Sequence, residues 1–357
     1  MMKKIAISIW GLALSLGIMA SEPCSPAYRL LNRLKKIQKK GIMIGHQDDP
    51  VYGRNWKWDR GRSDVKEVCG DYPAIMGFEL GGIELGETAN IDNVPFDRMR
   101  EEILAQHERG GVTTISWHPF NPVTEKNAWD PSGNPVKEIL PGGSQHQKFN
   151  KWLKIVADFL NSIQTVDGEK VPILFRPWHE MEGTWFWWGS KGTTVDEYKQ
   201  LYIYTHDQLL KRYACDQLLW GYSPNSGGAD YLKYYPGTQY VDLIGVDLYD
   251  FNKDNDVYIK NLKHDLEALK DIAITENKLV ALTETGAQTL PDSTWFTHVF
   301  WPVAKEYPIS YVLFWRNAWD NPKELYIAAP GLAVASDFRH FAKEKKTLFV
   351  KNIKKIK

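Results

Sequence analysis

The sequence predicts an α/β fold, a (β/α)8 TIM barrel that forms a single domain. Eight short apolar runs recur along the chain, each ending in polar or aromatic residues, and amphipathic helical patterns lie between them. Such runs are typical of strands buried on both faces of a parallel sheet, and eight of them alternating with helices indicate a closed barrel. The alternative is an open doubly wound sheet. Residues 45–49 read GHQDD, however, not the Gly-rich phosphate loop that follows the first strand of that fold.

Each strand is predicted from a run rich in apolar and β-branched residues. In chain order these runs are 42–47, 73–80, 111–118, 171–180, 217–225, 241–249, 279–286 and 309–317. Apolar residues at helical spacing predict helices over 97–109, 148–164, 194–212, 256–273 and 292–304. The helix over 194–212 opens with Thr194 and Glu197, which form a capping-box pattern.

The N-terminus has the pattern of a signal peptide over residues 1–20, followed by a catalytic domain over 21–357. Lys3 and Lys4 precede the apolar stretch 5–20, which is shorter than the roughly 20 residues that span a bilayer. We expect cleavage after Ala20, export, and a periplasmic location. Secretion and a surface lipoprotein anchored through Cys24 are the alternatives.

Charge and aromatic content narrow the class of partner. Lys and Arg number 44 and so do Asp and Glu, so nothing favours nucleic acid or an acidic membrane. The 15 Trp and 17 Tyr suit stacking on sugar rings, although an aromatic-rich core is the alternative. Cys24, Cys69 and Cys215 match no metal motif, and we expect no catalytic role for them. A monomer or a dimer is expected.

Polar and aromatic residues gather where the predicted strands end. In a barrel these ends meet at one face, which holds the active site. The strand-end residues are His46, Gln47, Glu79, Trp117, His118, His179, Glu180, Asn225, Asp247, Tyr249, Glu284, Trp315 and Arg316.

Two of these residues, Glu180 and Glu284, suit a retaining glycosidase. One carboxylate would attack the anomeric carbon, while the other would protonate the leaving oxygen and then activate water. The strands that carry them, the fourth and the seventh, lie across the barrel mouth from each other. Several tryptophans surround Glu180 in FRPWHEMEGTWFWWG (175–189), which predicts a raised pKa. Glu284 lies instead in TETG, which is expected to form a short polar turn whose donors keep it ionised as a nucleophile. Membership of structural ion pairs is the alternative.

Five segments resemble glycoside hydrolase family 26. They are SWHPFNP (116–122), FRPWHEMEGTWFWWG (175–189), YSPN (222–225), LTETG (282–286) and FWRNAW (314–319), and the likeness extends over roughly residues 40–345. Most members of this family are β-mannanases on barrels whose catalytic glutamates follow strands 4 and 7.

The resemblance implies roles for individual residues. Glu180 would be the acid/base and Glu284 the nucleophile, with His179 and His118 holding the sugar. Further substrate-binding roles are implied for Trp185, which would stack beyond the scissile bond, Tyr249, which would bond the nucleophile, Trp315 and Arg316 at the non-reducing subsites, and Asp247 and Trp117. Each has a structural alternative, an ion pair in the case of Arg316. No role is assigned to Glu79, and Glu182 is expected to point elsewhere on an extended backbone.

Other classes of function fit the sequence less well. A metal hydrolase would need the second His of HExxH, where Gly183 stands, or a metal held by His46, His118 and His179. A serine hydrolase would need a GxSxG elbow, which is absent. A non-catalytic carbohydrate-binding barrel would lose one of the two carboxylates. We therefore expect no metal and no organic cofactor.

The predicted activity is a retaining endo-β-1,4-mannanase that acts on mannan, glucomannan, galactomannan or their oligosaccharides. An exo-acting, mannobiose-releasing enzyme is the close alternative, and a β-glucanase or xylanase is a further one. The choice between endo and exo action depends on whether the loops 81–95 and 119–147 close the cleft.

Overall fold

A computed structural model describes residues 25–228 and 230–356, and its centre is a closed barrel of parallel strands. The predicted signal peptide and Cys24 lie outside the described residues. The barrel strands are β1 (Ile42–Gln47), β4 (Ile75–Glu79), β5 (Val112–Trp117), β6 (Ile173–Pro177), β7 (Leu218–Tyr222), β8 (Leu243–Asp250), β9 (Leu279–Ala287) and β10 (Tyr311–Phe314). Each pairs in parallel with the next, and β10 closes on β1 with Met43 opposite Tyr311. The predicted (β/α)8 class is confirmed.

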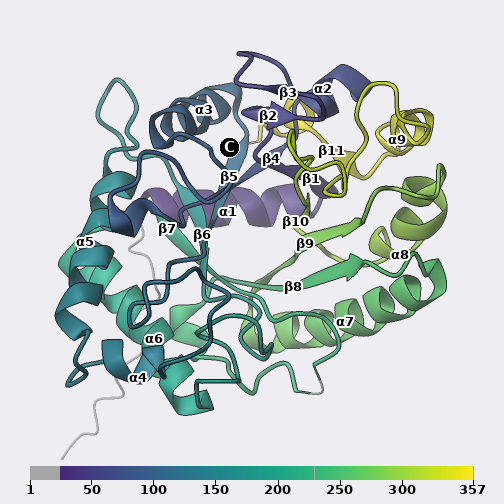
Figure 1. Ribbon diagram of the computed structural model, residues 1–357. Helices are drawn as coiled ribbons and strands as arrows, with labels where there is room; N and C mark the ends of the chain where they lie inside the picture. The colour runs from purple at the N-terminus through teal and green to yellow at the C-terminus, as the bar shows by residue number, and fades with distance from the viewer. Residues whose placement is uncertain (1–24, 229, 357) are drawn as a thin grey trace, which may run out of the picture.

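The helices lie outside these strands (Figure 1). They are α3 (Phe96–Arg109), α5 (His146–Asn161), α6 (Val195–Asp207), α7 (Asn255–Glu276) and α8 (Trp301–Ala304), with π-helical turns η2 (Gln208–Arg212) after α6 and η4 (Phe296–Phe300) before α8. All five predicted helical regions are confirmed. At the start of α6, the Thr194 side chain accepts the N–H of Glu197, and the Glu197 carboxylate accepts the N–H of Thr194. The capping box is thus present as predicted.

The helix α1 (Pro26–Gln38) closes the amino-terminal end of the barrel and was not predicted from the sequence. Its buried residues Leu30, Leu34 and Ile37 join a cluster with the first apolar residues of the strands, including Leu174 and Leu219. Beside it, β11 (Thr347–Leu348) pairs with β1 and is followed by α10 (Val350–Ile353). This end of the barrel is therefore sealed by apolar packing, which leaves the opposite end for a site.

Several short elements were not predicted either. They are the hairpin β2 (Tyr52–Gly53) and β3 (Trp56–Lys57), α2 (Asp64–Cys69), η1 (Ile83–Leu85), α4 (Pro135–Ile139), η3 (Thr238–Tyr240) and α9 (Ala335–Phe341). Cys69 is half-buried and Cys215 is buried, and both are free thiols. Within the described ranges, no helix has the length and apolar character needed to span a membrane.

Candidate active site

A cleft of about 480 Å³ opens at the carboxyl ends of the barrel strands. Side chains from the ends of six strands and the loops after them line it: His118, Trp129, His179, Glu180, Trp185, Phe186, Asn225, Tyr249, Phe251, Glu284, Trp315 and Tyr326. Both predicted catalytic carboxylates and five of the predicted substrate-binding residues thus share one cleft. This is the face where barrel enzymes carry their active sites.

Glu180 lies in a tight turn just beyond β6, not at the end of an extended strand as the sequence suggested. Trp178 and Glu180 have φ angles of 58° and 52°, in the left-handed region that residues other than glycine rarely adopt. The turn is held from both sides. The Tyr198 hydroxyl donates to the Trp178 carbonyl at 2.8 Å, and the N–H of Glu180 donates to the Ser223 carbonyl at 2.9 Å. The surrounding structure therefore maintains a backbone strain that aims Glu180 into the cleft.

The pKa of Glu180 is raised to about 8, in the direction that the sequence predicted. Burial is the main cause, and the negative charge of Glu284 is the second. The indole N–H of Trp185 donates to Glu180 Oε2 at 2.8 Å, and this bond acts the opposite way by lowering the pKa. Glu180 is thus a carboxylic acid that keeps its proton at neutral pH.

Glu284 lies inside β9, which corrects the expectation of a short polar turn, and two donors bind its carboxylate. Arg176, on β6, forms an ion pair with Oε1, and the Tyr249 hydroxyl donates to Oε2 at 2.7 Å. Burial and the Glu284 charge raise the pKa of Tyr249 well above its ordinary value, so this hydroxyl stays a donor. Both oxygens of Glu284 are therefore held in place by neighbours.

Arg176 is itself held between two buried carboxylates. Its Nη1 lies 2.9 Å from Asp247 Oδ2 and also donates to the Ser223 hydroxyl at 3.0 Å. The Thr283 hydroxyl donates to Asp247 Oδ1 at 2.6 Å. Asp247 does not line the cleft; it fixes the guanidinium that fixes Glu284.

The two histidines of the cleft have different surroundings, which shift their pKa values in opposite directions. His118 Nδ1 lies 2.6 Å from Glu79 Oε2, and although burial alone would lower the pKa of His118, the Glu79 carboxylate raises it above its usual value. Burial, and next the charge of Arg176, lower the pKa of His179 well below its usual value. The rings meet edge to face with centroids 4.4 Å apart. The pKa values of the two imidazoles are thus shifted in opposite directions, and Glu79 acquires the role of fixing His118.

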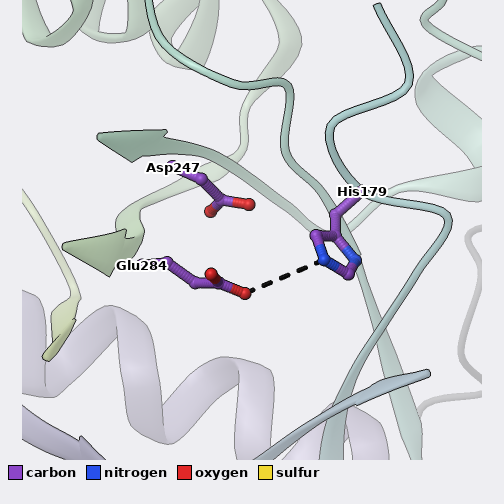
Figure 2. A group of neighbouring side chains, drawn as sticks. All are labelled: His179, Asp247 and Glu284. Carbon is purple, nitrogen blue, oxygen red and sulfur yellow. Dashed lines mark ion pairs between the residues drawn. The ribbon is translucent and has the colours of Figure 1, made fainter. Parts of the chain in front are cut away.

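His179, Asp247 and Glu284 form a group that has the donor types of a metal site (Figure 2). One ligand atom from each lies within 4.8 Å of the others, and His179 Nε2 is 3.9 Å from Glu284 Oε1. Both carboxyl groups, however, already pair with the positive charge of the Arg176 guanidinium. A divalent cation would have to compete with that charge, so this donor set does not fit a resident metal. The other histidine considered for a metal, His46, is buried beside Asp49 instead.

Besides Asp247, two further residues that the family resemblance placed among the substrate contacts lie outside the cleft lining. Trp117 is fully buried and donates its indole N–H to Glu84 Oε2 at 3.1 Å, which corrects its expected contact with substrate. Arg316 Nη1 pairs with Asp92 at 2.8 Å and its Nε with Glu324 at 2.5 Å. Arg316 is absent from the cleft lining, and its contact with substrate stays a prediction.

A hydrogen bond joins the loops 81–95 and 119–147, on which the choice between endo and exo action was predicted to depend. Glu84, in the loop after β4, accepts the N–H of Phe120, in the loop after β5, at 2.8 Å. Burial raises the pKa of Glu84 to about 7. Trp129, in the same second loop, lies parallel to the His118 ring with centroids 5.5 Å apart. The loop 119–147 thus contributes directly to the wall of the cleft.

Several residues of the site were not singled out from the sequence. The sequence did carry a signal for Arg176, because it is the only Lys or Arg in the motif 175–189 and precedes Glu180. Trp129, Phe186, Phe251 and Tyr326 lie in loops, and only the general excess of aromatic residues pointed to them. Glu182, thought to lie on extended backbone, follows the Glu180 turn and accepts the N–H of Asn225 at 2.6 Å.

Comparison with known proteins agrees with this architecture. The model of glycosyl hydrolase family 26 matches residues 19–327. A mannan endo-1,4-β-mannosidase of Bifidobacterium adolescentis is 32% identical over 89% of the chain, and one of Bacillus subtilis is 31% identical over 71% of the chain and 69% of its own length. The chain covers only 34% of the Bifidobacterium protein. Among solved structures, a family 26 β-mannanase from Bacteroides ovatus is 42% identical with a TM-score of 0.90, covering 93% of this chain and 98% of its own.

Proposed function

Since the chain belongs to glycosyl hydrolase family 26, we propose that it is a retaining endo-β-1,4-mannanase. The observation that carries the proposal is the placement of Glu180 and Glu284 in one cleft with opposite surroundings. Glu180 is a protonated acid with a pKa of about 8, and Glu284 is bound by a guanidinium and a phenol. An acid and a nucleophile need these two kinds of surroundings, one that keeps a carboxyl group protonated and one that binds a carboxylate.

In the first step, a Glu284 oxygen bonds to the anomeric carbon while the bond from that carbon to the leaving oxygen breaks. Glu180 gives its proton to the leaving oxygen, so the departing sugar leaves neutral and a glycosyl ester remains on Glu284. In the second step, Glu180 takes a proton from water as the water oxygen attacks the same carbon. Glu284 then departs as a carboxylate, and the product has the original configuration.

The charge of Glu284 couples the two steps. It raises the pKa of Glu180 in the free site, and this contribution disappears once Glu284 is esterified. The pKa of Glu180 therefore falls when the intermediate forms, which suits its change from acid to base. Arg176 and Tyr249 hold the Glu284 oxygens before attack and receive its charge again when the ester is cleaved.

The substrate proposal rests on relatives named as mannan endo-1,4-β-mannosidases. We infer mannan, glucomannan, galactomannan or their oligosaccharides as substrates. The aromatic lining of the cleft supports this choice, because Trp and Tyr rings stack on the apolar faces of pyranoses.

The test is a time course of products, resolved by chain length, from borohydride-reduced mannohexaose and from polymeric galactomannan. Mixed oligosaccharides with a fast fall in viscosity are expected from an endo enzyme. Mannobiose alone from the earliest points, with viscosity unchanged, would contradict endo action. Hydrolysis of β-glucan or xylan in place of both substrates would contradict the substrate assignment.

Export to the periplasm remains part of the proposal. It is supported by Lys3, Lys4, the apolar stretch 5–20 and Ala20 in the sequence. N-terminal sequencing of the mature protein from separated cell fractions tests it, with Ser21 expected as the first residue. Size-exclusion chromatography with light scattering tests the expected monomer or dimer.

A further inference from the structure

Phe251 is the most exposed large aromatic side chain of the cleft lining. It follows β8 and is 56% exposed, compared with 48% for Trp129 and 36% for Trp185. Phenylalanine has no polar atom for water to bond, so its exposure leaves a large apolar surface unsatisfied. An exposed apolar ring inside a cleft indicates a surface that a ligand covers.

One face of the Phe251 ring is backed by a second ring, and that ring is fixed. Phe251 lies nearly parallel to Tyr249, with centroids 4.9 Å apart and an interplanar angle of 21°. Tyr249 is held at its hydroxyl by Glu284, 2.7 Å away, and at its edge by Tyr326, 5.5 Å between centroids. The supported ring loses little freedom when a ligand stacks on its open face, which makes binding there less costly in entropy.

The same construction occurs a second time in the cleft. Trp129 is stacked on His118 at an interplanar angle of 10°, and His118 is fixed by Glu79. In both cases an exposed ring lies on a ring that is bonded to a buried or catalytic carboxylate. Flat apolar surfaces backed in this way are suited to the faces of pyranose rings.

The position of Phe251 on the rim assigns it to one side of the reaction. Trp185 follows β6 and Phe251 follows β8, so only β7, which contributes Asn225, lies between them. Trp185 donates to Glu180, whose proton goes to the leaving oxygen. The departing sugar therefore lies in the sector of the rim that Trp185 and Phe251 share.

From this geometry we propose that Phe251 is a stacking platform for a sugar of the leaving group. The inference rests on the proposed function, since it requires a glycan that is cleaved between Glu180 and Glu284. In this role Phe251 sets how tightly the cleft binds the sugars beyond the scissile bond. It therefore also sets which chain lengths are cleaved fastest.

The test compares two substrates for the variants Phe251→Ala and Phe251→Trp. Reduced mannopentaose has leaving-group sugars, whereas β-mannobiosyl fluoride has none and no aryl ring that might stack in their place. Phe251→Ala is expected to lower kcat/KM for the pentaose by about tenfold, the size of an aromatic stacking contribution, and to leave the fluoride unchanged. Phe251→Trp should restore the pentaose rate, because it supplies a flat ring again.

Val257→Ala is the matched control, because Val257 is 49% exposed on α7 and does not line the cleft. It should leave both rates unchanged. Equal losses on both substrates, or no loss on either, would overturn the inference while leaving the activity in place. A wild-type protein that cleaves no manno-oligosaccharide would instead defeat the proposed function, so the two failures are distinguishable.

Discussion

At the scale of single residues, the site consists of two glutamates and the neighbours that make them different. Glu180 has a strained backbone, a carboxyl group whose burial raises its pKa, and one indole donor. Glu284 has regular strand geometry, a guanidinium and a phenol. The raised pKa of Glu180 comes from its surroundings rather than from its residue type. Removal of either glutamate should therefore have a distinct outcome.

Glu284→Ala is expected to abolish turnover of every substrate, including those with activated leaving groups, because no other carboxylate can form the ester. Glu180→Ala should retain the first step on substrates with good leaving groups, which need no proton, and azide should accelerate the second step by replacing the activated water. Steady-state rates on a dinitrophenyl mannobioside, with and without azide, check both. Wild-type activity on mannan in either variant would refute the assignment.

The pH dependence follows from the raised pKa of Glu180. The acid form is needed for the first step, so kcat/KM should fall above about pH 8, where Glu180 ionises. Trp185→Phe removes the hydrogen bond that lowers this pKa, and the alkaline limb should move to higher pH. Stability should also fall as pH rises from the ordinary pKa of about 4.5 towards 8, because the folded state keeps a proton that the unfolded chain releases. A limb that stays fixed in Trp185→Phe would contradict this account.

Individual roles were harder to predict from the sequence than the identity of the carboxylates. Motif order placed Glu180 and Glu284 together, but nothing in the sequence marks Trp117 as buried beneath the cleft or Arg316 as paired with Asp92 and Glu324. Arg176 forms its ion pairs with residues on β8 and β9, far away in sequence. Such contacts depend on which way a strand side chain points, and that is set by the closed barrel.

At the scale of elements, local signals predicted the eight barrel strands and five helices, because each is encoded within its own segment. The eight strands agree with their predicted runs, and β1 agrees to the residue. The misses have physical reasons. The Glu180 turn interrupts a run over 171–180 that has the pattern of one apolar strand. The helix α1 packs on the end of the barrel, and no local sequence pattern shows where that end lies.

The capping box of α6 gives a prediction at this scale. Thr194→Ala removes the side-chain acceptor for the Glu197 N–H and should lower the free energy of unfolding by about 1 kcal/mol. Thr194→Ser keeps the hydroxyl and should cost only a small part of that. Chemical denaturation of the three proteins measures the difference, and an alanine variant as stable as wild type would show that the cap contributes nothing.

At the scale of the whole molecule, balanced charge and an uncharged substrate give a further prediction. The chain carries 44 positive and 44 negative side chains, so no net field steers a neutral glycan to the cleft. We expect kcat/KM on manno-oligosaccharides to change by less than about twofold between low and high salt, since only exposed charges are screened. The same assays with a chelator should give unchanged rates, because two of the three groups that could hold a metal, Asp247 and Glu284, already pair with Arg176. A steep salt dependence would point to an acidic polysaccharide, and inhibition by the chelator to a metal.

The closure of the barrel has a consequence for how the chain acquires its structure during synthesis. β1 is made before β4 to β9, yet two of its three partners, β10 and β11, are made after them. Until then one edge of β1 has no partner, and an open strand edge can pair with another chain. Contacts that join the two ends of a sequence also form slowly, because a long loop must close before they are made. One edge of β1 therefore stays unpaired until β10 and β11 have been made, and the cleft between Glu180 and Glu284 is complete only once β10 has docked and Trp315 and Tyr326 line it.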